Sequence, residues 1–514
     1  MTRPPSSPGL RKTHSRRVVA WLNRPLSSPG CFIGWCCAFV VFIGFTSLIG
    51  GPTEYDAAIS VYSTWAIANG HFACSYVQLT HFHVQPIGYP FTLIAPFYPL
   101  LSGLAMAVTR TANHAGFPTS SQLGPHCSTA ITAMFRWSTH SNVVQNTVRL
   151  GYFSWIFLLS GAVALLRALG RGRTNWEPVT LVALAILAPV SQCITQFFHP
   201  QDIVTIGFAL WSVACMMRGR WEWTGAFMAM AFATNQFVLL LAVPMFVLIP
   251  TAKRIRTVWA GVVTLAIVLL PIIVLTSDRA LRYALFGSST TIPLPQADPW
   301  FSGLHGVPLV IIARLPPIAI AAALAWWAQR RLGARMMDPV PLLSLLATCL
   351  ALRLVFEETL FAYYFAAALV FLLFLEVAGG RVRGTALTWY AVLLLAFNPM
   401  PLGFVNNPVE WSLKAHEVMP TIFLVIVVAL IIVDAVRRRV RWYLVAAAVL
   451  VSLVLVKWPW NHEVLRHVEP GWFWQVLLVS TLLWLTLSPL LSTINEHRRT
   501  TIESATETTA LADS

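Results

Sequence analysis

Long apolar segments separated by short basic connectors follow one another along the chain. Many of these segments reach about 18 residues, the length that a helix needs to cross the hydrocarbon core of a bilayer. Spans are predicted near residues 31–50, 147–169, 177–193, 203–217, 257–276, 306–328, 338–356, 359–378, 385–403, 418–435, 442–457 and 472–491. The pattern therefore predicts an all-α polytopic membrane protein.

The apolar run from Trp223 to Pro250 needs a different interpretation. It is too long for one straight crossing, and the residues on both sides of it are basic. We therefore predict two short helices that meet on the outer side, at residues 234–237. A polar break at membrane depth is tolerated where it lines a cavity within the protein. Counting both short helices, the chain is predicted to form a bundle of about 12–14 transmembrane helices.

The longest stretch between predicted spans covers residues 51–146 and is expected to form one large extracytoplasmic loop. Its segment 88–109 is apolar enough to span, but a crossing there would place the basic connector 167–173 outside. Prolines also interrupt this segment, and each removes a helical hydrogen bond. We expect residues 88–109 to form a re-entrant helix in the outer leaflet, and an ordinary span is the alternative.

Composition and charge agree with this topology. Hydrophobic residues make up 57% of the 514 residues and charged residues 11%. In soluble proteins, charged residues make up roughly a quarter of the sequence. The net charge of +15 comes mainly from basic residues in the short connectors, which is the positive-inside pattern of cytoplasmic loops. The charge thus indicates topology, and no nucleic-acid partner is expected.

Polar tails flank the predicted transmembrane domain, residues 31–494. Residues 1–30 are rich in Arg, Ser and Pro, residues 495–514 are polar, and both tails are predicted to be disordered and cytoplasmic. The protein is accordingly predicted to be a multi-pass protein of the plasma membrane, with both termini inside. Cys74 and Cys127 fall in the large external loop, where a disulfide between them is an open alternative.

Two acids follow the first predicted span, in a chain with only 20 Asp and Glu residues. Glu54 and Asp56 lie in the sequence Thr53-Glu-Tyr-Asp56, at the start of the external loop. Thr53 followed by Asp56 resembles a capping box that opens a helix. A carboxylate at this boundary would also suit a general base. The two roles are compatible, because a helix N-terminus favours the ionised carboxylate.

Two further polar motifs fall on the predicted outer side. His199, Gln201 and Asp202 lie in one short turn, and Asn235 and Gln236 lie in the break between the two short helices. Each motif has a structural alternative. Asp202 could cap the helix that follows, and the amides could satisfy the backbone at helix ends. A His beside an Asp is weak evidence for a metal site.

A third group of ionisable and aromatic residues is predicted near the outer ends of later spans. Its members are Arg314, Arg353, Glu357, Glu358, Tyr363 and Tyr364. Ionisable residues within membrane segments are functional candidates, because burying them is costly. An arginine also suits a phosphate, which accepts paired guanidinium hydrogen bonds. The alternative is that Arg353 and Glu357, four residues apart on a helix, only neutralise each other.

These motifs, in this order, resemble the polytopic C-type (GT-C fold) glycosyltransferases, in particular the actinobacterial family 87 mannosyltransferases that use polyprenyl-phosphate-mannose. In that fold a catalytic Asp lies in the large loop after the first span, and a second acidic motif follows two spans later. Asp56 matches the first position and Asp202 the second. Arg353, Glu357 and the Tyr363–Tyr364 pair resemble the family's later Arg…Glu…Tyr-Tyr stretch.

The resemblance implies an inverting transfer of a sugar, in the first place mannose, from a polyprenyl-phosphate donor to a cell-envelope glycan or glycolipid. Asp56 would act as the base, Arg353 would stabilise the departing phosphate, and the other residues named above would bind substrate. Neither a cofactor nor a metal is expected. The chain differs from the family in one place, since many relatives carry Lys where this chain has Asn235 or Gln236.

Two other classes of protein remain open. The sequence contains no Walker-type loop and no dinucleotide fingerprint, so a nucleotide-driven pump is not indicated. A transporter or lipid flippase would also have many spans and buried arginines, but it should place its ionisable residues near the midplane between repeats. A membrane scaffold without catalytic activity would tolerate Asp56→Asn.

Overall fold

The computed structural model describes residues 154–170, 190, 193, 199–286, 307–356, 362–379 and 471–512, and these ranges are helical with no strand. The α-helices are α8 (Trp155–Ala168), α11 (Pro200–Met217), α12 (Trp221–Thr234), α13 (Leu239–Leu248), α14 (Thr251–Phe286), α15 (Val307–Leu332), α16 (Pro339–Phe356), α17 (Ala366–Ala378) and α21 (Gly471–Ala512). Short 3-10 segments are η4 (Gln236–Val238), η7 (Gly333–Met337) and η8 (Ala362–Phe365). The predicted all-α class is confirmed for this part of the chain.

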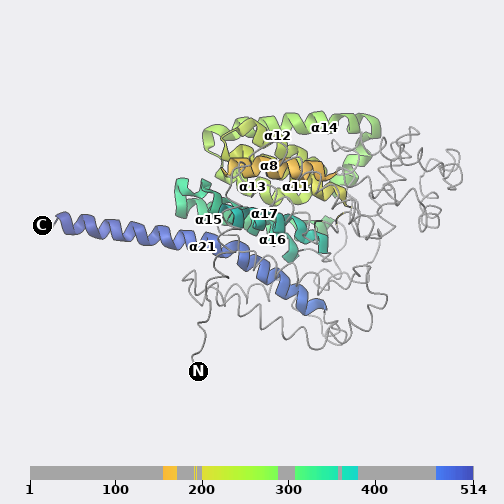
Figure 1. The fold of residues 1–514 in the computed structure, drawn as a ribbon. Helices are drawn as coiled ribbons and strands as arrows, with labels where there is room; N and C mark the ends of the chain where they lie inside the picture. The colour runs from red at the N-terminus through yellow and green to blue at the C-terminus, as the bar shows by residue number, and fades with distance from the viewer. Residues whose placement is uncertain are drawn as a thin grey trace, which may run out of the picture.

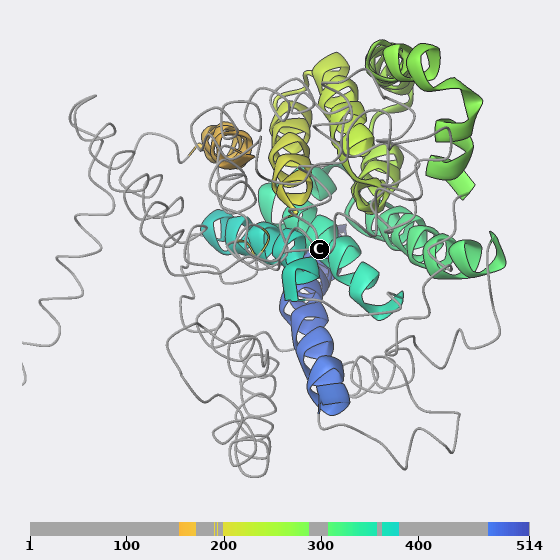
Figure 2. The same cartoon turned by 90° about the vertical axis from the view of Figure 1, so that its right-hand side faces the viewer.

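The helices form two groups that share one apolar core. In the first, α11 packs between α8 and α12, and α12 also packs on α14 (Figure 1). In the second, α16 contacts α15, α17 and α21. Helix α13 links the groups, because it follows α12 through η4 and packs on α15 and α16 of the second group. After a turn of 90° (Figure 2), α21 (blue) leaves the bundle on the side of α16 away from α12 and α14.

Three glycines at one end of the bundle, among the described residues, adopt the left-handed conformation. Gly170, Gly219 and Gly333 have φ values of 70°, 67° and 55°. A Cβ at any of them would meet nothing within 4 Å, so the backbone angle and not space selects glycine there. The turns at Gly219 and Gly333 make α12 antiparallel to α11 and α16 antiparallel to α15, so the end of each second helix lies on the side where the first one begins.

Glycine serves a different purpose where helices cross. A Cβ on Gly161 would lie 2.3 Å from the carbonyl oxygen of Gly207, and one on Gly207 would lie 2.5 Å from the Phe157 carbonyl. A Cβ on Gly225 would lie 1.9 Å from the Thr257 carbonyl oxygen. The α8–α11 and α12–α14 pairs therefore touch backbone to backbone. Close crossings at small residues are typical of helices that pack in membranes.

A side chain from α16 enters the backbone of α21 next to its internal proline. Pro489 lacks the N–H that would complete the helical ladder. Ser344 Oγ donates a hydrogen bond to the Thr486 carbonyl and accepts one from the Leu490 N–H at 3.1 Å. A carbonyl and an N–H four residues apart in α21 are thus bridged by one buried hydroxyl. The contact fixes the register of α21 against α16.

The predicted elements can be compared directly with these helices. The break predicted within Trp223–Pro250 is confirmed, because α12 ends at Thr234 and α13 begins at Leu239. Helix α21 continues to Ala512, whereas the sequence predicts a disordered tail from Asn495. Threonine hydroxyls in this part bond to carbonyls of the preceding turn, for example Thr506 to Ile502 at 2.9 Å.

The other predicted regions lie outside the described residues. These are the tail 1–30, the loop 51–146 with its segment 88–109, Cys74 and Cys127, and the spans near 31–50, 385–403, 418–435 and 442–457. Within the described part, α11 and α16 are long and apolar enough to cross a membrane by length and composition. Both are mostly buried in the protein. They support association with a membrane.

Candidate functional site

One end of the helix bundle gathers most of the polar residues singled out in the sequence. Helices α11, α13 and α15 begin there, α12 and α16 end there, and η8 precedes α17 there. We define the polar cluster as His199, Gln201, Asp202, Asn235, Gln236, Phe237, Arg314, Arg353, Tyr363 and Tyr364, which are joined by the contacts described below. Five separate segments of the chain contribute to it.

Asp202 lies in the first turn of α11 and is 4% exposed. The Nδ2 atom of Asn235 donates a hydrogen bond to its Oδ1 atom at 2.5 Å. Helix α11 begins at Pro200 with His199 as its N-cap, so Asp202 is not the cap that the sequence offered as an alternative. A carboxylate at this depth is costly to bury without partners. The Asn235 amide is one group that compensates it, because a hydrogen bond to a charged group contributes about 1.5–3 kcal/mol.

Arg314 lies in the second turn of α15, where its guanidinium Nη1 donates to the Gln236 Oε1 atom at 2.5 Å. The two residues are 78 positions apart in the chain, so this bond joins the α12–α13 break to α15. Arg314 is exposed to solvent or lipid at this end. Its charge is thus held at the outer boundary of the cluster, where an anionic group can approach it.

Arg353 lies in the last turn of α16. Its guanidinium carbon is 4.3 Å from the ring centroid of Tyr364 and 5.0 Å from that of Phe237. Both distances are within the range of a cation–π interaction, which contributes about 0.5–2 kcal/mol according to how far the pair is desolvated. Asp202 lies close to this group, because its partner Asn235 also accepts a hydrogen bond from the Phe237 N–H. The positive and negative charges of the cluster therefore occupy one neighbourhood.

Aromatic rings continue the cluster back to α11. Tyr363 and Tyr364 meet edge to face at 4.5 Å, and the His199 ring stacks on Tyr363 at 4.4 Å. Gln201 Nε2 donates to His199 Nδ1 at 2.7 Å, which places the proton of a neutral His199 on Nε2. The Gln201 Oε1 atom is buried without a hydrogen-bond partner. Contacts thus run from α11 through η8, α16 and η4 and return to α11 at Asp202.

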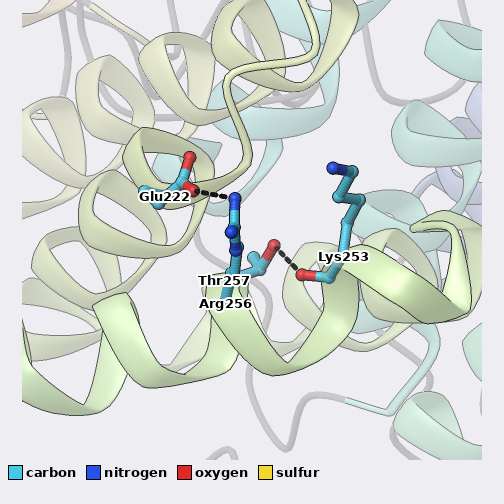
Figure 3. A network of polar contacts seen from close by, with 4 residues as sticks. All are labelled: Glu222, Lys253, Arg256 and Thr257. Carbon is cyan, nitrogen blue, oxygen red and sulfur yellow. Dashed lines mark hydrogen bonds and ion pairs between the residues drawn. The ribbon is translucent and has the colours of Figure 1, made fainter.

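The opposite end of the bundle carries basic side chains that are mostly exposed. Its residues in the described part include Arg167, Arg218, Arg220, Lys253, Arg254, Arg256, Arg330, Arg331 and Arg335. Figure 3 shows this end: Arg256 is 3.7 Å from Glu222, and Thr257 donates to the Lys253 carbonyl at 3.1 Å. Both members of the ion pair are more than half exposed, so the pair stabilises the protein little. The two ends of the bundle therefore differ in charge and in burial.

The placement of each predicted site residue follows from these contacts. The structure brings together His199, Gln201, Asp202, Asn235, Gln236, Arg314, Arg353, Tyr363 and Tyr364. Glu54, Asp56, Glu357 and Glu358 lie outside the described residues, so the proposed pairing of Arg353 with Glu357 stays a prediction. Phe237 was missed in the sequence, because an isolated apolar residue gives no signal of its contact with a charge.

Comparisons with known proteins do not assign the chain to a family. No family model matches it, and no curated protein is similar to it. Among the described side chains, no group of three or more His, Cys, Asp or Glu is placed to hold a metal ion. The ground for a function is therefore the chemistry of the cluster itself. It contains one carboxylate, four amide or imidazole side chains and two guanidiniums.

Proposed function

We propose that this protein is a polytopic membrane glycosyltransferase of the GT-C type. It moves a sugar, in the first place mannose, from a polyprenyl-phosphate donor to an extracytoplasmic glycan or glycolipid. The observation that carries the proposal is the convergence of Asp202, Arg314 and Arg353 at one end of a bundle of apolar helices. Positive groups for a phosphate and polar groups for hydroxyls meet there at the same site.

The surface of α14 supports a membrane setting. Large apolar side chains on one side of this helix are exposed, among them Ile255, Trp259, Val262, Ile267 and Leu270. They recur at intervals of three to five residues, so they form one stripe along the helix. The small residue Gly261 lies on the side of α14 that touches α12. An apolar stripe of this length suits contact with lipid chains.

The basic end supports an orientation. The connectors there carry the arginines and lysines named above, which is the charge pattern of the cytoplasmic side. Arg330 lies 3.9 Å from the ring centroid of Trp326, which is half exposed. A tryptophan beside a cation suits the interface between lipid and water. The polar cluster would then face outside, and the C-terminal half of α21 would extend into the cytoplasm (Figure 1).

The transfer follows from the chemistry of the two substrates. An acceptor hydroxyl attacks the anomeric carbon, and the new carbon–oxygen bond forms as the bond to the phosphate oxygen breaks. Asp56 takes the proton, and the polyprenyl phosphate leaves with the electron pair. Arg353 and Arg314 stabilise the charge on that phosphate. Asp202 orients the acceptor hydroxyl, and displacement from the opposite face inverts the anomeric centre.

Membranes that contain the full chain should transfer radiolabelled mannose from polyprenyl-phosphate-mannose to an alkyl mannoside. We expect Arg353→Ala to lower kcat/KM for the donor by about 10²-fold, because a charge that stabilises the leaving phosphate is lost. Arg353→Lys keeps the charge but loses the planar group and should recover only part of the activity. Glu222→Gln, at the basic end, is the control and should match the wild type.

Two outcomes would contradict the proposal. Movement of the intact lipid donor across the bilayer without any mannosylated product would favour a flippase. Full transfer by Arg353→Ala, at wild-type protein levels, would remove the cluster from the donor site.

A further inference from the structure

The break between α12 and α13 contacts every charged side chain of the polar cluster. Asn235 donates to Asp202 of α11, Gln236 accepts from Arg314 of α15, and the Phe237 ring lies 5.0 Å from the guanidinium of Arg353 of α16. Three consecutive residues thus reach three different helices. Those helices carry the one carboxylate and the two guanidiniums of the cluster.

The backbone of the break explains how neighbouring side chains can diverge in this way. Asn235 has φ −154° and ψ 136°, so the chain is extended at the point where α12 ends. The 3-10 segment η4 then starts at Gln236. The Asn235 Oδ1 atom accepts a hydrogen bond from the Phe237 N–H at 3.3 Å, which closes the turn locally. Asn235 therefore uses one end of its amide to hold the turn and the other end to hold Asp202.

We propose that Asn235, Gln236 and Phe237 are positioning residues that set the places of Asp202, Arg314 and Arg353, one contact for each charge. A continuous helix would separate successive side chains by about 100° and would continue the ladder of backbone hydrogen bonds beyond the Asn235 N–H, which bonds to the Ala231 carbonyl. The break replaces that ladder with contacts to three neighbouring helices. The spacing between carboxylate and guanidiniums is then fixed by three adjacent residues on one rigid turn.

Substitutions can separate this role from simple support of the fold. Asn235→Ser keeps an oxygen that can close the turn but is too short to hold Asp202. Gln236→Leu removes the acceptor for Arg314, and Gln236→Glu retains it. Phe237→Leu keeps apolar volume and loses the ring, and Phe237→Tyr keeps the ring. Asn235→Ser thus keeps the turn and loses the contact, and the changes at Gln236 and Phe237 each have a partner variant that keeps the contact.

The kinetic consequence rests on the proposed transferase function. With polyprenyl-phosphate-mannose and an alkyl mannoside, Asn235→Ser should raise the acceptor KM about tenfold and leave the donor KM within about twofold. Gln236→Leu and Phe237→Leu should raise the donor KM about tenfold and leave the acceptor KM within about twofold. Phe237→Tyr should restore the donor KM, whereas Gln236→Glu should not, because its carboxylate would offset the charge of Arg314 at the phosphate site. A role in folding alone would lower kcat in every variant without this division, and that result would overturn the inference.

A second measurement does not depend on activity. Thermal unfolding of the full chain in detergent is measured for each positioning variant combined with alanine at its own charged partner. The shift in Tm of each pair should differ from the sum of the two single shifts by about 1–2 °C, because the groups interact. Combining Asn235→Ser with Arg314→Ala should be additive. Additive shifts within all three pairs would overturn the inference.

The two proposals can fail separately. Wild-type membranes that transfer mannose, but whose variants show no division between donor and acceptor KM, would retain the function and reject the positioning role. Membranes without transfer would reject the function, and the unfolding cycles would then decide the positioning role alone.

Discussion

Asp56→Asn is expected to abolish mannose transfer. Loss of a general base lowers the rate by about 10²–10⁴-fold, and we expect the decrease in kcat to lie within this range. The donor KM should change little, since donor binding is assigned to the arginines. The measurement is the initial rate of product formation in membranes that contain equal amounts of each protein.

This substitution also separates the two interpretations of Asp56. Asparagine caps helices about as well as aspartate, so a residue with a capping role alone would tolerate the change. Asp338→Asn makes the same chemical change at an exposed position between η7 and α16 and serves as the control. Wild-type rates for Asp56→Asn in correctly folded protein would exclude Asp56 as the base.

Gly207→Leu is expected to prevent folding. Even the first carbon of a side chain at this position would lie 2.5 Å from the Phe157 carbonyl group of α8, and backbone atoms cannot move aside as a flexible side chain can. Gly207→Ala should already destabilise the protein by about 1–3 kcal/mol through overpacking. The yield of monodisperse protein in detergent and its Tm measure both effects.

Gly379→Ala provides the matched control for the crossing of α8 and α11. A Cβ there would lie 3.5 Å from its nearest neighbour, the Leu375 carbonyl oxygen, and Gly379 has an ordinary right-handed conformation with φ −68°. Its Tm should stay within about 1 °C of the wild type. Equal yields and Tm values for Gly207→Leu and the wild type would show that α8 and α11 do not touch as described.

Local features of the fold could be predicted because they depend on neighbouring residues. The break at Asn235–Gln236 follows from an apolar run that is too long for one crossing and has basic residues at both ends. The start of α11 was predicted at residue 203, where its apolar run begins, and the helix begins three residues earlier, at Pro200. The basic connectors likewise predicted which ends of successive helices lie on the same side of the bundle. In each case a few adjacent residues carried the signal.

Contacts between distant segments could not be predicted in the same way. The approach of Gly161 to Gly207 depends on how two helices cross, and each glycine alone is an ordinary helix residue in the sequence. The position of Phe237 beside Arg353 depends on the packing of α13 against α16. The sequence grouped Asp202 and Arg353 only by their predicted side of the membrane, whereas the contacts that link them through Asn235 and Phe237 are a property of the folded bundle.

The most direct test of the account is a cryo-EM structure of the full chain in a nanodisc with a polyprenyl-phosphonate-mannose analogue. We predict that the phosphonate contacts Arg353 and Arg314, and that the mannose lies toward Asp202 and Asp56. A phosphonate bound elsewhere would contradict it. So would a distance of more than about 15 Å from Asp56 to both Asp202 and Arg353, which is far beyond the reach of groups that act on one reacting bond.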